Sequence, residues 1–134
     1  MLDQPPRTGS LKTITFEVQQ SHTITFTHKS EISVLSTPSL IWFLEQAALQ
    51  FLEPWLDDQS LSVGTHVDVE HLAPTPIGAT VSCTARLIYQ DAPVYRFSVE
   101  AYAGQEKIAK GVHSRRIIKA NQLVKRLKKQ LDFY

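Results

Sequence analysis

The chain has 134 residues, of which 20% are charged, and a formal net charge of +1 at pH 7. This length predicts a single domain with a hydrophobic core, and the balanced charge argues against a polyelectrolyte binder. No segment approaches the ~20 apolar residues of a membrane-spanning helix, and residues 1–10 lack the apolar core of a secretory signal. With one cysteine, Cys83, we expect neither an intramolecular disulfide nor a cysteine-based zinc cluster. These features together predict a cytoplasmic protein.

The N-terminal part predicts a tail followed by two strands. Residues 1–10 are polar and contain prolines, which is typical of a flexible tail. Apolar and polar side chains then alternate over residues 11–18 and 22–28, which is the period of half-buried strands.

A long apolar helix is predicted from Thr37 to about Glu53. Ser36 can cap its first turn, Pro38 fits an early helical position, and Pro54 disfavours further helix. Its side chains are apolar on nearly every face, so we expect the helix to be buried all round. One curved sheet would cover most of it, and a second copy of the chain would cover the rest.

Glu45 is the only charged residue in the interior of this helix. An ionised carboxylate among apolar side chains is unstable unless something pairs with it. Burial would make it a stronger base, suited to general base chemistry near neutral pH. The structural alternative is that Glu45 reaches solvent or one hydrogen-bonding partner in the core.

The second half of the chain is rich in strands, which we predict at residues 63–69, 80–89, 94–103 and 107–118. The connections between the last three are short enough for antiparallel hairpins. Helix and strands together predict an α+β fold, with one domain over residues 11–119.

Residues 120–134 predict a basic C-terminal helix, with Leu123, Leu127 and Leu131 on one stripe. We expect these leucines to dock on the domain while the basic side chains face solvent. Binding of an anionic surface or a partner is the alternative. No groove of aromatic and basic residues is evident, so nucleic-acid binding is not expected.

Three polar residues mark the predicted helix and its surroundings: Thr37 at its start, Glu45 within it, and His71 after the next strand. Eight helical positions separate Thr37 from Glu45 by ~12 Å of rise, a gap that suits a water or a small reacting group. A lone histidine at a strand end is commonly structural. A serine-hydrolase triad is not supported, because the Gly-x-Ser-x-Gly elbow is absent from the sequence.

The segments that carry these residues resemble a known family. The hotdog-fold thioesterases related to fluoroacetyl-CoA thioesterase are closely similar to residues 34–40, 45–48, 63–81 and 107–116. The resemblance covers roughly residues 12–118, and the loop around His71 is its most specific part. It implies a long helix wrapped by a curved antiparallel sheet, and a homodimer, or a tetramer, built by joining sheets edge to edge.

By position, the family's catalytic threonine, glutamate and histidine fall on Thr37, Glu45 and His71. A glycine near the substrate carbonyl falls on Gly64, and an arginine near the site falls on Arg115. The resemblance implies hydrolysis of an acyl-CoA thioester, with no cofactor besides the CoA of the substrate. Glu45 would be the general base or nucleophile, and Thr37 would position water or act as an alternative nucleophile. His71 would stabilise developing charge and could protonate the thiolate.

The predicted acyl pocket departs from the fluoroacetyl-specific pattern. In that enzyme, phenylalanines before the threonine form a lid over a very small pocket, whereas residues 27–32 contain none here. We therefore expect a short- or medium-chain acyl group, lying against Ile32, Leu40, Trp42 or Phe43. The CoA phosphates would attract nearby cations, for which the candidates are Lys29, Arg115, Arg116 and Lys119.

Two other functions fit a hotdog domain: a non-catalytic acyl-CoA-binding ligand sensor, and a hydratase or dehydratase acting on acyl thioesters. A pure binder has no need of a buried carboxylate beside a thioester. The hydratases would place an Asp/His or Glu/His pair in a differently patterned helix. Thioester hydrolysis is therefore the preferred prediction.

Overall fold

The computed structural model describes residues 2–26 and 32–132. In chain order its elements are β1 (Leu11–Glu17), β2 (Thr23–Thr25), β3 (Ser33–Leu35), α1 (Thr37–Leu52), β4 (Ser60–His71), β5 (Thr80–Asp91), β6 (Val94–Ala103), β7 (Glu106–Lys119) and α2 (Ala120–Asp132). Two short 3-10 turns, Gln20–His22 and Glu53–Trp55, precede β2 and follow α1.

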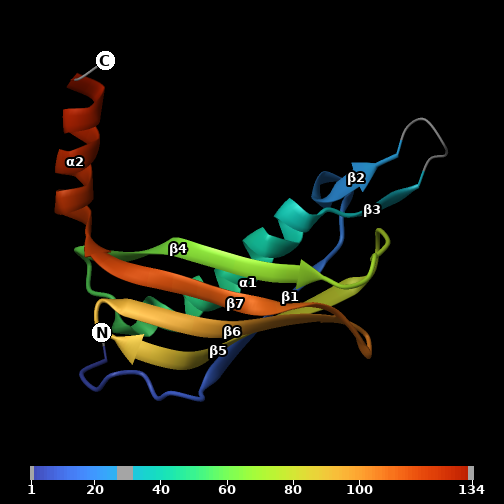
Figure 1. Ribbon diagram of the computed structural model, residues 1–134, viewed down its shortest axis with the longest axis horizontal. Helices are drawn as coiled ribbons and strands as arrows, with labels where there is room; N and C mark the ends of the chain where they lie inside the picture. Colours follow the sequence, from blue (N-terminus) through green and yellow to red (C-terminus); the bar gives the residue numbers. More distant parts are fainter. Residues whose placement is uncertain (1, 27–31, 133–134) are drawn as a thin grey trace.

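Five antiparallel strands form one sheet in the order β1-β5-β6-β7-β4, and β2 pairs with β3 in a separate ribbon. Figure 1 shows α1 behind this curved sheet, with β2 and β3 extending beyond one end of it. One long helix packed on one curved antiparallel sheet is the predicted α+β hotdog architecture, which is thereby confirmed. The strand β4, which follows α1, lies at the edge of the sheet.

Local sequence explains where α1 begins and ends. The Ser36 hydroxyl accepts a hydrogen bond from the Ser39 N–H at 3.2 Å, and Pro38 occupies the first turn. The helix gives way to a 3-10 turn at Glu53, where Pro54 cannot donate a backbone hydrogen bond. The predicted bounds of this helix are therefore accurate to one residue.

In the single chain α1 is covered on one face only, as expected of a helix whose other face needs a second copy of the chain to cover it. Its buried residues lie on the face toward the sheet: Leu40, Leu44, Ala47, Ala48, Phe51 and Leu52. On the other side Trp42 is 53% exposed, because one sheet can cover only one face of a helix.

The core lies between α1 and the sheet. The strands contribute fully buried side chains that alternate along their length, among them Val81, Leu87, Phe97, Val99 and Ile108. The Phe51 ring of α1 meets the Phe97 ring of β6 edge to face, with centroids 5.3 Å apart. This contact packs α1 against β6, the central strand of the sheet.

The strands at the N-terminal end differ from the prediction. The strand predicted at residues 22–28 is short, because Gln20–His22 forms a 3-10 turn and β2 covers Thr23–Thr25. Residues 27–31 lie outside the described residues. The sequence did not indicate β3, since three residues are too few to show a period.

Contacts from the rest of the domain hold the segment before β1, for which the sequence predicts a flexible tail. The indole N–H of Trp55 donates to the Gln4 carbonyl at 2.6 Å, and the Gln90 amide donates to the Pro6 carbonyl at 2.6 Å. The Gly9 N–H also donates to the Leu87 carbonyl at 2.7 Å. The partners are backbone carbonyls, which a sequence pattern does not reveal.

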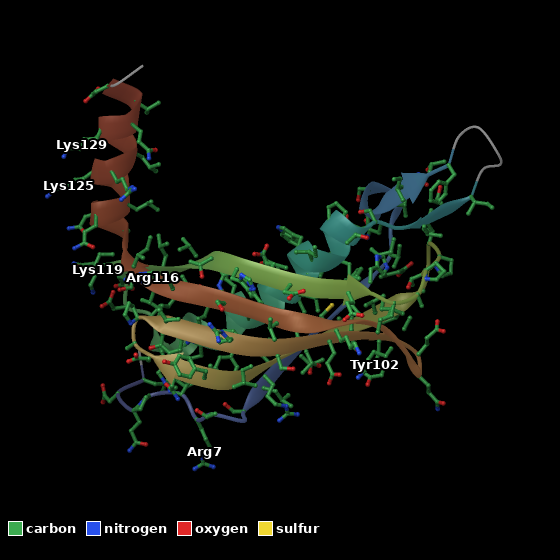
Figure 2. The ribbon with its side chains drawn as sticks, viewed as in Figure 1. Arg7, Tyr102, Arg116, Lys119, Lys125 and Lys129 are labelled. Carbon is green, nitrogen blue, oxygen red and sulfur yellow. The ribbon has the colours of Figure 1, made fainter. Side chains whose placement is uncertain are left out.

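The helix α2 does not dock its leucines on the domain, so this prediction is wrong for the single chain. Leu127 is 47% exposed and Leu131 is 74% exposed, and Figure 1 shows α2 projecting away from the sheet. Figure 2 shows Lys125 and Lys129 pointing outward from α2. Among the residues described, neither α1 nor α2 has the length and apolar character of a membrane-crossing helix.

Candidate active site

The start of α1 meets the end of β4. Thr37 is the first residue of α1 and His71 the last of β4, and the Thr37 Oγ1 lies 2.8 Å from the His71 Nδ1 as a hydrogen bond. A backbone hydrogen bond from the Leu35 N–H to the Thr75 carbonyl, at 2.8 Å, ties the segment before α1 to the loop after β4. The fold thus brings together two of the three residues predicted to be catalytic.

The second imidazole nitrogen of His71 differs from the first in its hydrogen bonding. Its Nε2 is buried and has no hydrogen-bond partner among the residues described. A buried polar nitrogen without a partner is uncommon in native structures and calls for a functional explanation.

Glu45 lies two turns further along α1, with its carboxylate against the backbone of β4. A Cβ atom built on Gly64 would stand 2.6 Å from the Glu45 Oε1, closer than any real contact allows. The carboxylate therefore occupies the space that a side chain at position 64 would fill. The Glu45 side chain is 31% exposed in the single chain, so its carboxylate reaches solvent, which the sequence leaves open as the structural alternative.

Two residues of β7 complete the surroundings of this carboxylate. Arg115 is paired with Gly64 in the β4–β7 register, and His113 lies two residues before it on the same strand. The same Cβ position on Gly64 would be 3.2 Å from the His113 Cε1 and 3.4 Å from an Arg115 guanidinium nitrogen. Glu45, His113 and Arg115 thus converge on one backbone position of β4.

Arg115 is a buried cation, 5% exposed. Its Nε donates to the Ser62 hydroxyl at 2.9 Å, and another guanidinium nitrogen donates to the Ser62 carbonyl at 2.8 Å. Burial lowers the pKa of Arg115, and the charge of Glu45 acts in the opposite direction. The guanidinium retains its charge at neutral pH because its ordinary pKa is very high.

The described residues make no hydrogen bond or ion pair between the Thr37–His71 pair and the Glu45 cluster. Their separation agrees with the eight helical positions between Thr37 and Glu45. The arrangement offers a carboxylate beside a buried cation at one place, and a hydroxyl bonded to an imidazole at another.

Of the predicted acyl-contact residues, Trp42 and Ile32 are exposed, whereas Leu40 is fully buried on the face of α1 toward the sheet, so its predicted contact with the acyl group is wrong for the single chain. Ile32 is 57% exposed and Trp42 is 53% exposed. The Phe43 ring stacks on Phe16, with centroids 3.6 Å apart, and meets Trp42 edge to face at 4.9 Å. Phe43 is thus half-buried and packed against the core, whereas Ile32 and Trp42 are exposed in the single chain.

The candidate phosphate contacts have different surroundings. The Lys119 Nζ is paired with the Asp57 carboxylate at 3.3 Å, whereas Arg116 is exposed. Arg115 is buried beside Glu45, which places it in the candidate site and away from the outer surface. Lys29 lies outside the described residues.

Comparison with known proteins identifies the family. A family model described as fluoroacetyl-CoA-specific thioesterase matches residues 18–121. The chain belongs to this family. The fluoroacetyl-CoA thioesterase of Streptantibioticus cattleyicolor is 33% identical over 85 residues, which cover 63% of this chain and 61% of that enzyme. The match to this curated relative thus spans less than two thirds of its length.

Solved structures of this thioesterase family extend the similarity to nearly the whole chain. A point mutant of the fluoroacetyl-CoA-specific thioesterase FlK superposes with a TM-score of 0.87 at 26% identity, covering 96% of this chain and 99% of that chain. The same mutant in complex with fluoroacetate and CoA superposes with a TM-score of 0.81 at 28% identity, covering 88% of this chain and 99% of that one.

Sequence reasoning did not identify His113 as a member of the site. The available signal was its position two residues before Arg115 in a predicted strand, which puts both side chains on one face. Ser62 was missed as well, because its role depends on how β4 pairs with β7.

Proposed function

We propose that the chain hydrolyses an acyl-CoA thioester to a free acid and CoA. The observation that carries this proposal is the Glu45 carboxylate, held against the β4 backbone at Gly64 with a buried arginine beside it. Membership of a thioesterase family supports it, as does a related structure that holds fluoroacetate and CoA.

Glu45 and Arg115 have different roles in this reaction: Glu45 attacks the thioester or activates water, and Arg115 stabilises negative charge. Glu45 is partly exposed, so as a general base or nucleophile it can meet water and the thioester carbon. Negative charge then develops on the thioester oxygen, and the buried guanidinium of Arg115 stabilises it. The backbone N–H of Gly64, which carries no side chain of its own, would face the same oxygen beside the Glu45 carboxylate.

The Thr37–His71 pair acts on the other reacting groups. Thr37 positions the water or serves as an alternative nucleophile. The unpaired Nε2 of His71 delivers a proton to the departing thiolate. The reaction requires no cofactor, since CoA is part of the substrate.

The acyl group is short or medium in length and lies on the apolar surface of Ile32, Trp42 and Phe43. The absence of a lid phenylalanine from residues 27–32 supports an acyl group larger than two carbons. A second copy of the chain, joined through the edge strand β4, covers this surface in a homodimer.

The test measures release of free CoA thiol from a panel of acyl-CoAs, from acetyl to decanoyl, with phenylacetyl- and fluoroacetyl-CoA included. The wild type should turn over one acyl class best, and Glu45→Gln should lose about 100-fold or more in kcat with little change in binding. Unchanged turnover in Glu45→Gln would exclude the proposed role. Tight binding across the panel without thiol release would favour the ligand-sensor alternative.

A further inference from the structure

His113 is the most deeply buried titratable side chain near Glu45, with 1% of its surface exposed. Its Nδ1 lies 2.8 Å from the His66 backbone carbonyl, and its Nε2 lies 3.2 Å from an Arg115 guanidinium nitrogen. Both ring nitrogens therefore have a partner, and both partners come from the strands that form the candidate site.

The chemistry of these partners selects one form of the imidazole. A backbone carbonyl only accepts, so the Nδ1 must carry a proton and donate it to His66. A guanidinium only donates, so the Nε2 must carry a lone pair and accept from Arg115. The neutral Nδ1–H tautomer alone satisfies both contacts, whereas an imidazolium would direct an N–H at the guanidinium.

This tautomer also decides how His113 relates to Glu45. The His113 Nε2 lies 3.9 Å from the Glu45 Oε1, which is within range of an ion pair. The lone pair on this nitrogen faces Arg115, however, so there is no proton to share with the carboxylate. Burial lowers the pKa of His113, in agreement with a neutral ring.

Each of the three guanidinium nitrogens of Arg115 has a partner. Ser62 accepts from its Nε and from one terminal nitrogen, and the His113 Nε2 accepts from the other. The nitrogen bound to His113 is also the one nearest to the Cβ position of Gly64, beside the Glu45 carboxylate. His113 is thus the acceptor for the guanidinium nitrogen that lies beside the carboxylate.

We propose that His113 is a positioning residue: as a neutral imidazole it holds the Arg115 guanidinium at Gly64, where the reacting thioester meets Glu45. This inference rests on the proposed function, since the thioester is the molecule on which the arginine acts. It assigns to His113 no contact with substrate. Its effect on catalysis passes through Arg115.

Two substitutions of His113 separate its two hydrogen bonds. In His113→Asn the side-chain amide can occupy the place of Nδ1 and donate to His66, but nothing reaches Arg115. In His113→Gln the amide oxygen can occupy the place of Nε2 and accept from Arg115, while the bond to His66 is lost. Each variant loses one buried hydrogen bond, so their stabilities should fall by similar amounts.

The two variants should differ in turnover. We expect His113→Asn to lose about 10- to 100-fold in kcat with KM little changed, because the displaced guanidinium no longer stabilises the transition state. His113→Gln should keep most of the wild-type kcat. Equal losses that follow the melting temperatures of the two variants would show a merely structural role and overturn the proposal.

A second measurement tests the tautomer without relying on activity. Nitrogen-15 NMR of histidine-labelled wild-type protein, with the His113 ring correlated to its own backbone, should show a protonated Nδ1 and an unprotonated Nε2 at pH 7.5. An Nε2–H tautomer or an imidazolium would refute the positioning role. If the wild type releases no thiol from any acyl-CoA, the proposed function fails, while this spectrum still decides the geometry of His113.

Discussion

The close approach of Glu45 to Gly64 makes Gly64→Ala a sharp test of the site. The new Cβ would start 2.6 Å from the Glu45 Oε1, and an ordinary van der Waals contact begins near 3.4 Å. The carboxylate oxygen must therefore retreat by about 0.8 Å. A displacement of about 1 Å in a catalytic group can cost about 100-fold in rate, or about 2.7 kcal/mol in the activation barrier.

The stability of Gly64→Ala, unlike its activity, should not fall. The backbone at Gly64 does not require positive φ, and the Glu45 oxygen is the end of a flexible side chain. The His113 Cε1, 3.2 Å from the new Cβ, has to give by only a few tenths of an ångström. Alanine also reduces the conformational freedom of the unfolded chain, so stability should stay equal or rise by about 0.4–1 kcal/mol. Loss of activity with retained stability is the result expected if glycine is needed at position 64 to leave space for the Glu45 carboxylate.

The assay combines steady-state thiol release with urea unfolding of Gly64→Ala and the wild type. We expect kcat to fall about 30- to 100-fold while the unfolding midpoint stays the same or rises. A variant with wild-type kcat would show that the position of Glu45 against β4 does not matter. A large fall in the unfolding midpoint would show that Gly64 is required by the fold.

Three further predictions concern the rest of the domain. A Cβ on Gly111 would meet the backbone of β4 at the Val69 Cα, 2.7 Å away. Gly111→Ala should therefore lower the free energy of unfolding, measured by urea titration, by about 1–3 kcal/mol. Unchanged stability would contradict this packing. Burial raises the pKa of the Cys83 thiol to about 12, so an alkylating reagent at pH 8 should modify it only after denaturation, and fast labelling of the native protein would refute its burial. Because burial lowers the pKa of His113 from its usual 6.5, the stabilising effect of its neutral form is fully present above pH 6.5 and is lost as the pH falls through the folded value. Urea unfolding at pH 7.5 and 5.5 should therefore show a smaller acid loss in His113→Gln than in the wild type, and equal losses would argue against a buried neutral ring.

The parts of the fold that local sequence determines were predicted well. The strand predicted at residues 94–103 coincides with β6, because alternation and the turn residues on both sides are local signals. The helix from Thr37 was predicted from a capping serine and two prolines. Thr37, Glu45 and His71 stood out from the residues alone, and the family resemblance supported catalytic roles for them and added Gly64 and Arg115.

The remaining features depend on contacts that are distant in the sequence. Gly64 faces Arg115 only because β4 and β7 pair in one register, which shifts between Gly64 and His66. The role of His113 follows from the same pairing. The exposure of Leu131 on α2 could not be predicted either, since an apolar stripe shows that a helix has a face to cover and does not show what covers it.

Two small residues of the core affect the position of the Glu45 carboxylate. Ala47 and Ala48 are fully buried on the face of α1 that meets the sheet, and their single methyl groups allow the helix to lie close to the strands. The reach of Glu45 to the backbone at Gly64 depends on that distance. Natural variation at positions 47 and 48 can thus tune turnover through side chains that never meet a substrate, so relatives with identical catalytic residues can evolve different speeds.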